Sequence, residues 1–139
     1  MASTRTANSH WEGSLLEGAG TVSLDSSGLG TFDVTWAART EEPGGKTSPE
    51  ELIAAALSSC FNMALSNRLA GAGTPPQALD TRADVTFQPG EGITGIVVTV
   101  RGRVDGIDNA AFAESAEEGC PVSQALAGTT ITFDAALVD

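Results

Sequence analysis

The chain has 139 residues, which is enough for one domain with a hydrophobic core of its own. Acidic side chains outnumber basic ones by 18 to 7, and this excess argues against nucleic acid or an anionic membrane as a partner, because both bind basic patches. One His and two Cys are too few for a structural zinc site, and there is no P-loop or dinucleotide-binding glycine motif, so neither a metal nor a cofactor is expected.

Residues 1–8 are polar and are predicted to form a loose leader to a single domain that spans residues 1–139. They contain no apolar core of a signal peptide, so we expect a cytoplasmic protein. Thiols are kept reduced in that compartment. Two cysteines there are more often reactive or redox-active than joined in a structural disulfide.

Short strands separated by glycines are predicted at residues 11–16, 21–24 and 29–37. In the last of these, Phe32, Val34 and Trp36 alternate on one face, which is typical of a strand. A polar loop at residues 39–46 is expected to lead into the longest helical segment of the chain.

That segment, residues 47–70, is predicted to be the central helix. Ser48 can serve as N-cap, Pro49 fits the first turn, Glu50 suits the positive end of the helix dipole, and Gly71 ends the helix. Apolar side chains occur on nearly every face, which predicts a buried helix. Polar residues interrupt it too often for a membrane span.

The second half of the chain is predicted to contain two hairpin strands, an amphipathic helix, a short helix and a closing strand, at residues 79–88, 93–104, 108–118, 120–126 and 130–137. Cys120 falls at or next to the N-cap of the short helix, because Pro121 suits its first position. The order of elements predicts an α+β fold, with largely antiparallel sheets packed around the long helix.

Cys60 lies near the middle of the long helix, on an apolar stripe with Leu57 and Ala64. A buried structural cysteine is the commoner interpretation of such a residue. Apolar surroundings raise a thiol pKa and make the thiol inert. A reactive Cys60 therefore needs a cation from elsewhere in the chain.

Cys120 has a means of activation of its own, because free N–H groups at a helix start favour the thiolate. A small residue packed beside Pro121 is an equally good interpretation. Together the two positions suit a two-thiol peroxidase, in which one thiolate becomes a sulfenic acid and the other condenses with it to a disulfide.

Arg39 is the best candidate among the basic residues for the activating cation, because it comes just before the long helix. A Glu at the helix start could hold its guanidinium by a bidentate pair. From the residues alone, a solvated loop charge for Arg39 and a helix-dipole residue for Glu50 remain the commoner interpretations.

Five parts of the chain carry a resemblance to known proteins: TSPEELIAAALSSCF with NMAL, CPVSQAL, HWEG, DTRADVTF and ITFDAAL. They resemble the OsmC/Ohr family, the osmotically induced protein C and organic hydroperoxide resistance proteins. The resemblance covers nearly the whole chain, and CPVSQALAG and HWEG favour the OsmC branch. It implies an OsmC-like fold and a thiol-dependent peroxidase acting on organic hydroperoxides.

The resemblance also implies residue roles. Cys60 would be the peroxidatic thiol, Cys120 the resolving thiol, Arg39 the activating cation and Glu50 the residue that orients it. A dithiol such as a dihydrolipoyl protein would be the reductant. The alternative is a non-catalytic ligand-binding or structural stress protein of the same fold.

Glu50 and Cys60 are ten residues apart in one predicted helix, about 15 Å along its axis. One chain could not bring them together, so we expect an intertwined homodimer. In it, two long helices cross antiparallel and each site is built from both chains. Small residues between positions 54 and 59 would allow the close approach.

Overall fold

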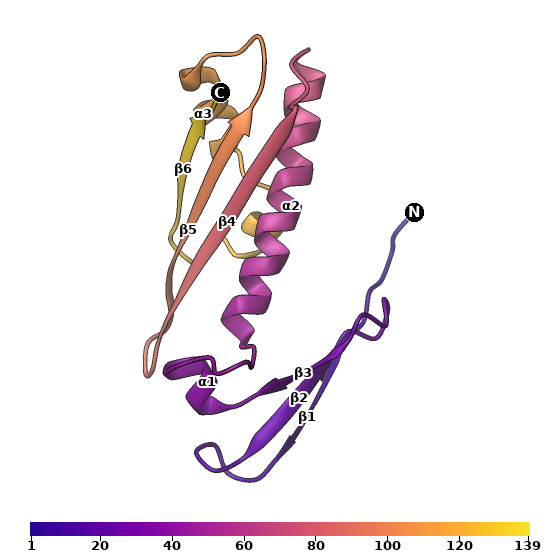
Figure 1. The fold of residues 1–139 in the computed structure, drawn as a ribbon, viewed down its shortest axis with the longest axis vertical. Helices are drawn as coiled ribbons and strands as arrows, with labels where there is room; N and C mark the ends of the chain where they lie inside the picture. The colour runs from indigo at the N-terminus through magenta and orange to yellow at the C-terminus, as the bar shows by residue number, and fades with distance from the viewer. The chain divides into compact units, whose positions relative to one another are not determined.

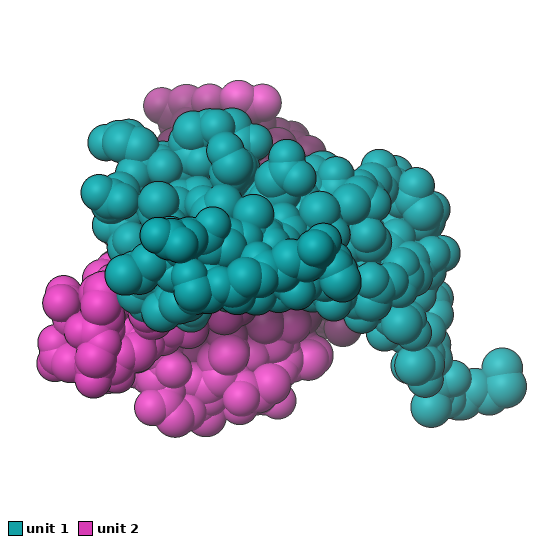
Figure 2. Space-filling model, turned by 90° about the horizontal axis from the view of Figure 1, so that it is seen from below, with its two compact units in different colours: residues 1–52 teal, residues 53–139 magenta.

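The computed structural model describes residues 1–139, which form two compact units of residues 1–52 and 53–139 (Figure 2). The long helix α2 (Pro49–Gly71) contributes its first turn to the first unit and the rest to the second. It begins within two residues of the predicted position. Ser48 acts as the expected N-cap, because its hydroxyl accepts a hydrogen bond from the Glu51 N–H at 3.2 Å. The prediction of one domain over residues 1–139 stays a prediction.

The first unit contains an antiparallel sheet of three short strands in sequence order, β1 (Asn8–Glu12), β2 (Ala19–Ser23) and β3 (Thr31–Val34). The predicted third strand was too long, because a short helix, α1 (Trp36–Thr40), replaces its end. The Thr35 hydroxyl caps this helix by accepting the Ala38 N–H at 3.0 Å. Arg39 therefore lies in a helical turn, and its prediction as a loop residue was wrong.

The predicted leader is tied to the first unit at its last residues. The Thr6 N–H donates to the Ser26 hydroxyl at 2.6 Å, and the Ser26 N–H donates back to the Thr6 carbonyl at 3.1 Å. The Asn8 amide also donates to both carboxylate oxygens of Asp25, at 2.7 and 2.6 Å. The loose leader is therefore shorter than predicted.

The second unit contains a sheet of order β4-β5-β6, formed by β4 (Ala78–Gln88), β5 (Gly92–Arg103) and β6 (Ile131–Leu137). Strands β4 and β5 make the predicted antiparallel hairpin. Strand β6 pairs with β5 in parallel, while the other strand pairs of both sheets are antiparallel, so the expectation of largely antiparallel sheets is confirmed. The helices α3 (Asn109–Glu117) and α4 (Pro121–Ala125) supply the crossover that a parallel pair needs, and α2 runs along the sheet (Figure 1).

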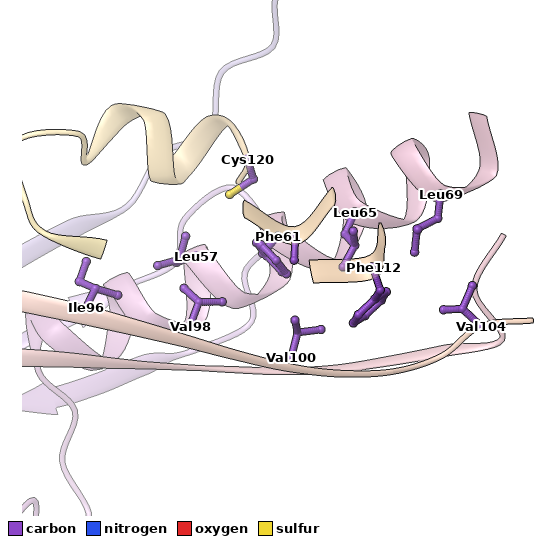
Figure 3. Packing of buried hydrophobic residues seen from close by; sticks show 11 residues of the cluster. Leu57, Phe61, Leu65, Leu69, Ile96, Val98, Val100, Val104, Phe112 and Cys120 are labelled. Carbon is purple, nitrogen blue, oxygen red and sulfur yellow. The ribbon is translucent and has the colours of Figure 1, made fainter. Parts of the chain in front are cut away.

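One stripe of α2 forms the core of the second unit. Its four members are spaced by four residues and are fully buried, namely Leu57, Phe61, Leu65 and Leu69. They face Ile96, Val98 and Val100 of β5 (Figure 3). Other faces of the helix stay uncovered, and Met63 is 73% exposed. The prediction of a helix buried all round was therefore wrong for the chain by itself.

Phe112 of α3 completes this core by lying over Gly102 of β5. A Cβ atom added at Gly102 would come within 2.6 Å of the Phe112 ring, and Phe112 is fully buried. The missing side chain of Gly102 therefore makes room for the aromatic ring.

Gly102→Ala should lower the free energy of unfolding by about 1–3 kcal/mol, because the fully buried ring cannot move aside. Urea unfolding followed by circular dichroism measures the change. Gly95→Ala is the matched control on the same strand, since its added Cβ would meet no heavy atom closer than 3.8 Å. Equal loss of stability in the two variants would contradict this account of the packing.

Candidate active site

The two cysteines occupy different environments in the second unit. Cys60 precedes the core residue Phe61 on α2 and is half-buried, whereas Cys120 is 1% exposed. Both are free thiols. A reagent arriving from solvent therefore meets Cys60 first.

Cys60 opens into a largely apolar pocket of about 450 Å³, which is lined by Cys60, Met63, Ala64, Asn67, Arg68 and Pro121. Most of these residues come from α2, while Pro121 is the first residue of α4. The pocket can therefore take an apolar group next to the Cys60 sulfur.

Cys120 is the N-cap of α4, as predicted from Pro121. The Ser123 N–H donates to the Cys120 sulfur at 3.5 Å. The Ser123 hydroxyl accepts the Cys120 N–H at 2.8 Å and donates to the Cys120 carbonyl at 2.9 Å. Through this capping box, the Ser123 hydroxyl fixes both the backbone N–H and the backbone carbonyl of Cys120.

The surroundings of Cys60 act on its pKa in both directions. Burial raises the pKa of the Cys60 thiol, and the backbone N–H of Val122 lowers it by hydrogen bonding to the sulfur. A hydrogen bond with Cys120 and the charge of Cys120 raise the pKa further, so the net shift is upward. Cys60 and the start of α4 are therefore neighbours, since Cys60 packs against the core cluster that contains Cys120 and shares its pocket with Pro121.

Arg39 and Glu50 form the predicted bidentate pair within the first unit. Arg39 Nε lies 2.9 Å from Glu50 Oε1, and an Arg39 Nη atom lies 2.9 Å from Glu50 Oε2. The Glu50 side chain is only 9% exposed. The guanidinium also lies 5.9 Å from the centre of the Trp36 ring. The carboxylate thus holds a cation in one orientation.

A second apolar pocket, of about 180 Å³, lies beside this ion pair. Its walls include Trp11, Leu15, Val34, Trp36 and Arg39. The structure thus brings the four predicted site residues together as two pairs. Arg39 with Glu50 belongs to the first unit, and Cys60 with Cys120 belongs to the second.

Two groups around the thiols, the Val122 N–H and Ser123, were missed from the sequence, and so was the contact of Arg68 with the end of α3. The signal for Ser123 was present, because a hydroxyl three residues after an N-cap is part of a capping-box pattern. Val122 and Arg68 act through contacts between elements far apart in the chain, and no local pattern indicates them.

No three His, Cys, Asp or Glu side chains are grouped so as to hold a metal ion. No helix combines the length and the apolar character that crossing a membrane requires.

Comparison with known proteins places this arrangement in context. Residues 42–135 match the family described as OsmC-like protein. The chain is 41% identical over 140 residues to Peroxiredoxin OsmC of Escherichia coli (strain K12), covering 96% of both chains, and equally to Peroxiredoxin OsmC of Shigella flexneri.

A solved structure with the same fold is an OsmC-like protein from Mycoplasma pneumoniae, with a TM-score of 0.72, 15% identity and full coverage of both chains. An organic hydroperoxide resistance protein OsmC from Legionella pneumophila has a TM-score of 0.66 and 23% identity, covering 100% of this chain and 99% of its own. At these identities the likeness establishes the fold and not the activity.

Cys120→Ala should lower the pKa of Cys60, because the hydrogen bond and charge of Cys120 both raise it. The pH at which alkylation of Cys60 by iodoacetamide reaches half its maximal rate should therefore move downward. Peptide mapping assigns the alkylated residue. Cys120→Ser is the comparison: its hydroxyl is uncharged and can donate a hydrogen bond to the Cys60 thiolate, which favours the ionised form, so its downward shift should be at least as large. An unchanged or higher midpoint in Cys120→Ala would contradict the effect of Cys120 on the pKa of Cys60.

Proposed function

The chain belongs to the family of OsmC-like proteins, and we propose that it is a thiol-dependent peroxidase that reduces organic hydroperoxides to alcohols. The observation that carries the proposal is the pair of neighbouring free thiols, one open to an apolar pocket and the other fully buried in the core cluster against which the first packs. The names of the curated relatives, which are peroxiredoxins, support the same reaction class.

Two thiols suffice for the reaction. The Cys60 thiolate attacks an oxygen of the hydroperoxide, so that an S–O bond forms, the O–O bond breaks and the alkoxide leaves to take up a proton. The Cys120 sulfur then attacks the resulting sulfenic acid, and the S–S bond forms as hydroxide leaves and is protonated to water. An external dithiol reduces the disulfide and restores both thiols.

The first step needs an ionised Cys60, and its own unit holds its pKa above the ordinary value. The cation in the proposal is Arg39, and the buried Glu50 orients it by the bidentate pair. A fixed guanidinium would lower the pKa of the thiol and stabilise the departing alkoxide.

Apolar walls beside both parts of the site favour organic hydroperoxides over hydrogen peroxide. Each Å² of apolar contact with a substrate is worth roughly 25 cal/mol, and hydrogen peroxide has no apolar surface to bury. A bulky alkyl or aryl group next to the O–O bond would therefore strengthen binding.

The proposed site is completed by a second copy of the chain. Glu50 and Cys60 are ten positions apart in α2, about 15 Å along the helix axis. The uncovered faces of α2, which include Ala55, Ala56 and Met63, give a second α2 an apolar surface to pack on. Two helices crossing antiparallel would place Arg39 of each chain beside Cys60 of the other.

We place this reaction in the cytoplasm, where disulfides are reduced and thiol reductants are present. The reductant would be a dithiol, of which a dihydrolipoyl protein is an example. The competing function is a binding or structural stress protein of the same fold with inert thiols, and thiol titration separates the two.

One equivalent of cumene hydroperoxide should remove two free thiols per chain and leave a Cys60–Cys120 disulfide, which peptide mapping identifies. Cys60→Ser should lose no thiol, because no other group can attack the peroxide. Cys120→Ser should react once and leave a sulfenic acid on Cys60 that dimedone traps. No thiol loss in the wild-type protein would favour the binding protein.

Mixed dimers test the shared site. Cys60→Ser and Arg39→Ala chains should each be nearly inactive alone. Refolded together, they should regain part of the wild-type rate, because one of the two sites in each mixed dimer is then intact. Affinity tags of two kinds on the two chains isolate the mixed species. A monomer by sedimentation, or an isolated mixed dimer no more active than its parents, would contradict the shared site.

A further inference from the structure

Arg68 connects the helix that carries Cys60 to the segment that carries Cys120. It lies on α2, two turns beyond Cys60. Its Nε donates to the Ser115 carbonyl at 3.1 Å and lies 3.5 Å from the carboxylate of Glu118. Both of these residues are at the end of α3, just before Cys120. The contact therefore anchors the approach to Cys120 onto the Cys60 helix.

Arg68 lowers the stability of the fold at this position through one of its polar atoms. One of its terminal nitrogens is buried and has no hydrogen-bond partner. A buried N–H group without a partner destabilises the fold, and an apolar side chain of similar size would fill the space without that cost. What an apolar residue could not supply is the directed hydrogen bond to the end of α3.

Ser123 holds the other side of Cys120. Its hydroxyl bonds to both the N–H and the carbonyl of Cys120, at 2.8 and 2.9 Å, and the Ser123 side chain is buried. Between the two anchors the chain turns at Gly119, which has a φ of 72°. A Cβ atom at Gly119 would collide with the Ser123 hydroxyl, so glycine is needed for the turn and for the close fit.

We propose that Arg68 and Ser123 are positioning residues for the disulfide-forming step, which hold Cys120 where its sulfur meets that of Cys60. The inference rests on the proposed function for its biological setting, but formation of the Cys60–Cys120 disulfide can be followed by thiol–disulfide exchange without a peroxide. A thiol held against its target reacts as if it were highly concentrated, and a displacement of about 1 Å can cost on the order of a hundredfold in rate. The two residues set this placement without touching the peroxide.

The test uses 5,5′-dithiobis(2-nitrobenzoate), an aromatic disulfide, in place of a peroxide. Cys60 attacks the reagent, forms a mixed disulfide and releases one thionitrobenzoate. Cys120 then attacks the Cys60 sulfur of the mixed disulfide, closes the protein disulfide and releases a second thionitrobenzoate, so that atoms and electrons balance. The half-buried Cys60 reacts before the buried Cys120, and stopped-flow absorbance follows both releases.

Ser123→Ala should leave the first release within about twofold of the wild-type rate and slow the second by about ten- to a hundredfold. Arg68 also lines the Cys60 pocket, so for Arg68→Met the readout is the ratio of the two rates, and the second release should slow about tenfold or more relative to the first. Ser123→Thr, which keeps a capping hydroxyl, should restore most of the second rate, and Arg68→Lys should restore part of it.

The matched controls are Arg82→Met and Ser9→Ala. Arg82 pairs with Asp84 on β4, and the Ser9 hydroxyl donates to the Thr21 carbonyl in the other unit, so neither change should affect either release. An unfolded variant would expose both thiols and speed both releases, which differs from the expected slowing of the second alone.

A second release at the wild-type rate in both Arg68→Met and Ser123→Ala would overturn the positioning role. If both variants slow the second release but cumene hydroperoxide removes no thiol from the wild-type protein, the peroxidase proposal is overturned and the positioning role stands. The two proposals therefore fail through different measurements.

Discussion

The packing of one stripe of α2 against β5 is the contact on which the rest of the second unit depends. Leu57, Phe61, Leu65 and Leu69 are spaced by four residues, so their burial fixes the rotation of the helix about its axis. Cys60 comes directly before Phe61, so the same rotation places its thiol at the border of the core. There it is half-buried, packed against the core cluster that contains Cys120 and open to the apolar pocket.

That placement has an electrostatic consequence. Burial and the neighbouring thiol raise the pKa of Cys60, and the single N–H of Val122 does not compensate for them. Arg39 is held in one orientation by the nearly buried Glu50, which suits it to act on an anion. Glu50 and Cys60 are ten positions apart in α2, about 15 Å along its axis, and this separation is the reason for proposing that a second chain supplies the cation.

The same stripe accounts for the faces of α2 that stay uncovered. Three strands of one small sheet cover one side of the helix, while Met63 and the alanines on other sides remain exposed. Burial also separates the two thiols, because Cys60 is half-buried and opens to the apolar pocket whereas Cys120 is fully buried. In the reaction that we propose, Cys60 therefore meets the substrate, and Cys120 reacts only with a group that is already on Cys60.

The amino-acid sequence by itself determined the features that depend on neighbouring residues. These include the start of α2 with its Ser48 cap, the β4–β5 hairpin and the N-cap position of Cys120 beside Pro121. Such features arise from dihedral preferences and hydrogen bonds within a few residues, so a local pattern reports them. Even at this range the alternation of Phe32, Val34 and Trp36 was misleading, because the Thr35 hydroxyl starts a helix within it.

Only the tertiary structure decided which face of α2 is covered, that β6 joins β5 in parallel, and that Arg68 reaches the end of α3. It also placed the Val122 N–H on the Cys60 sulfur, between residues about 60 positions apart. A helix that is apolar on several sides can pack through any of them, so its sequence pattern does not determine which face becomes buried. The choice follows from the shape of the surface that folds against it, to which distant segments contribute together.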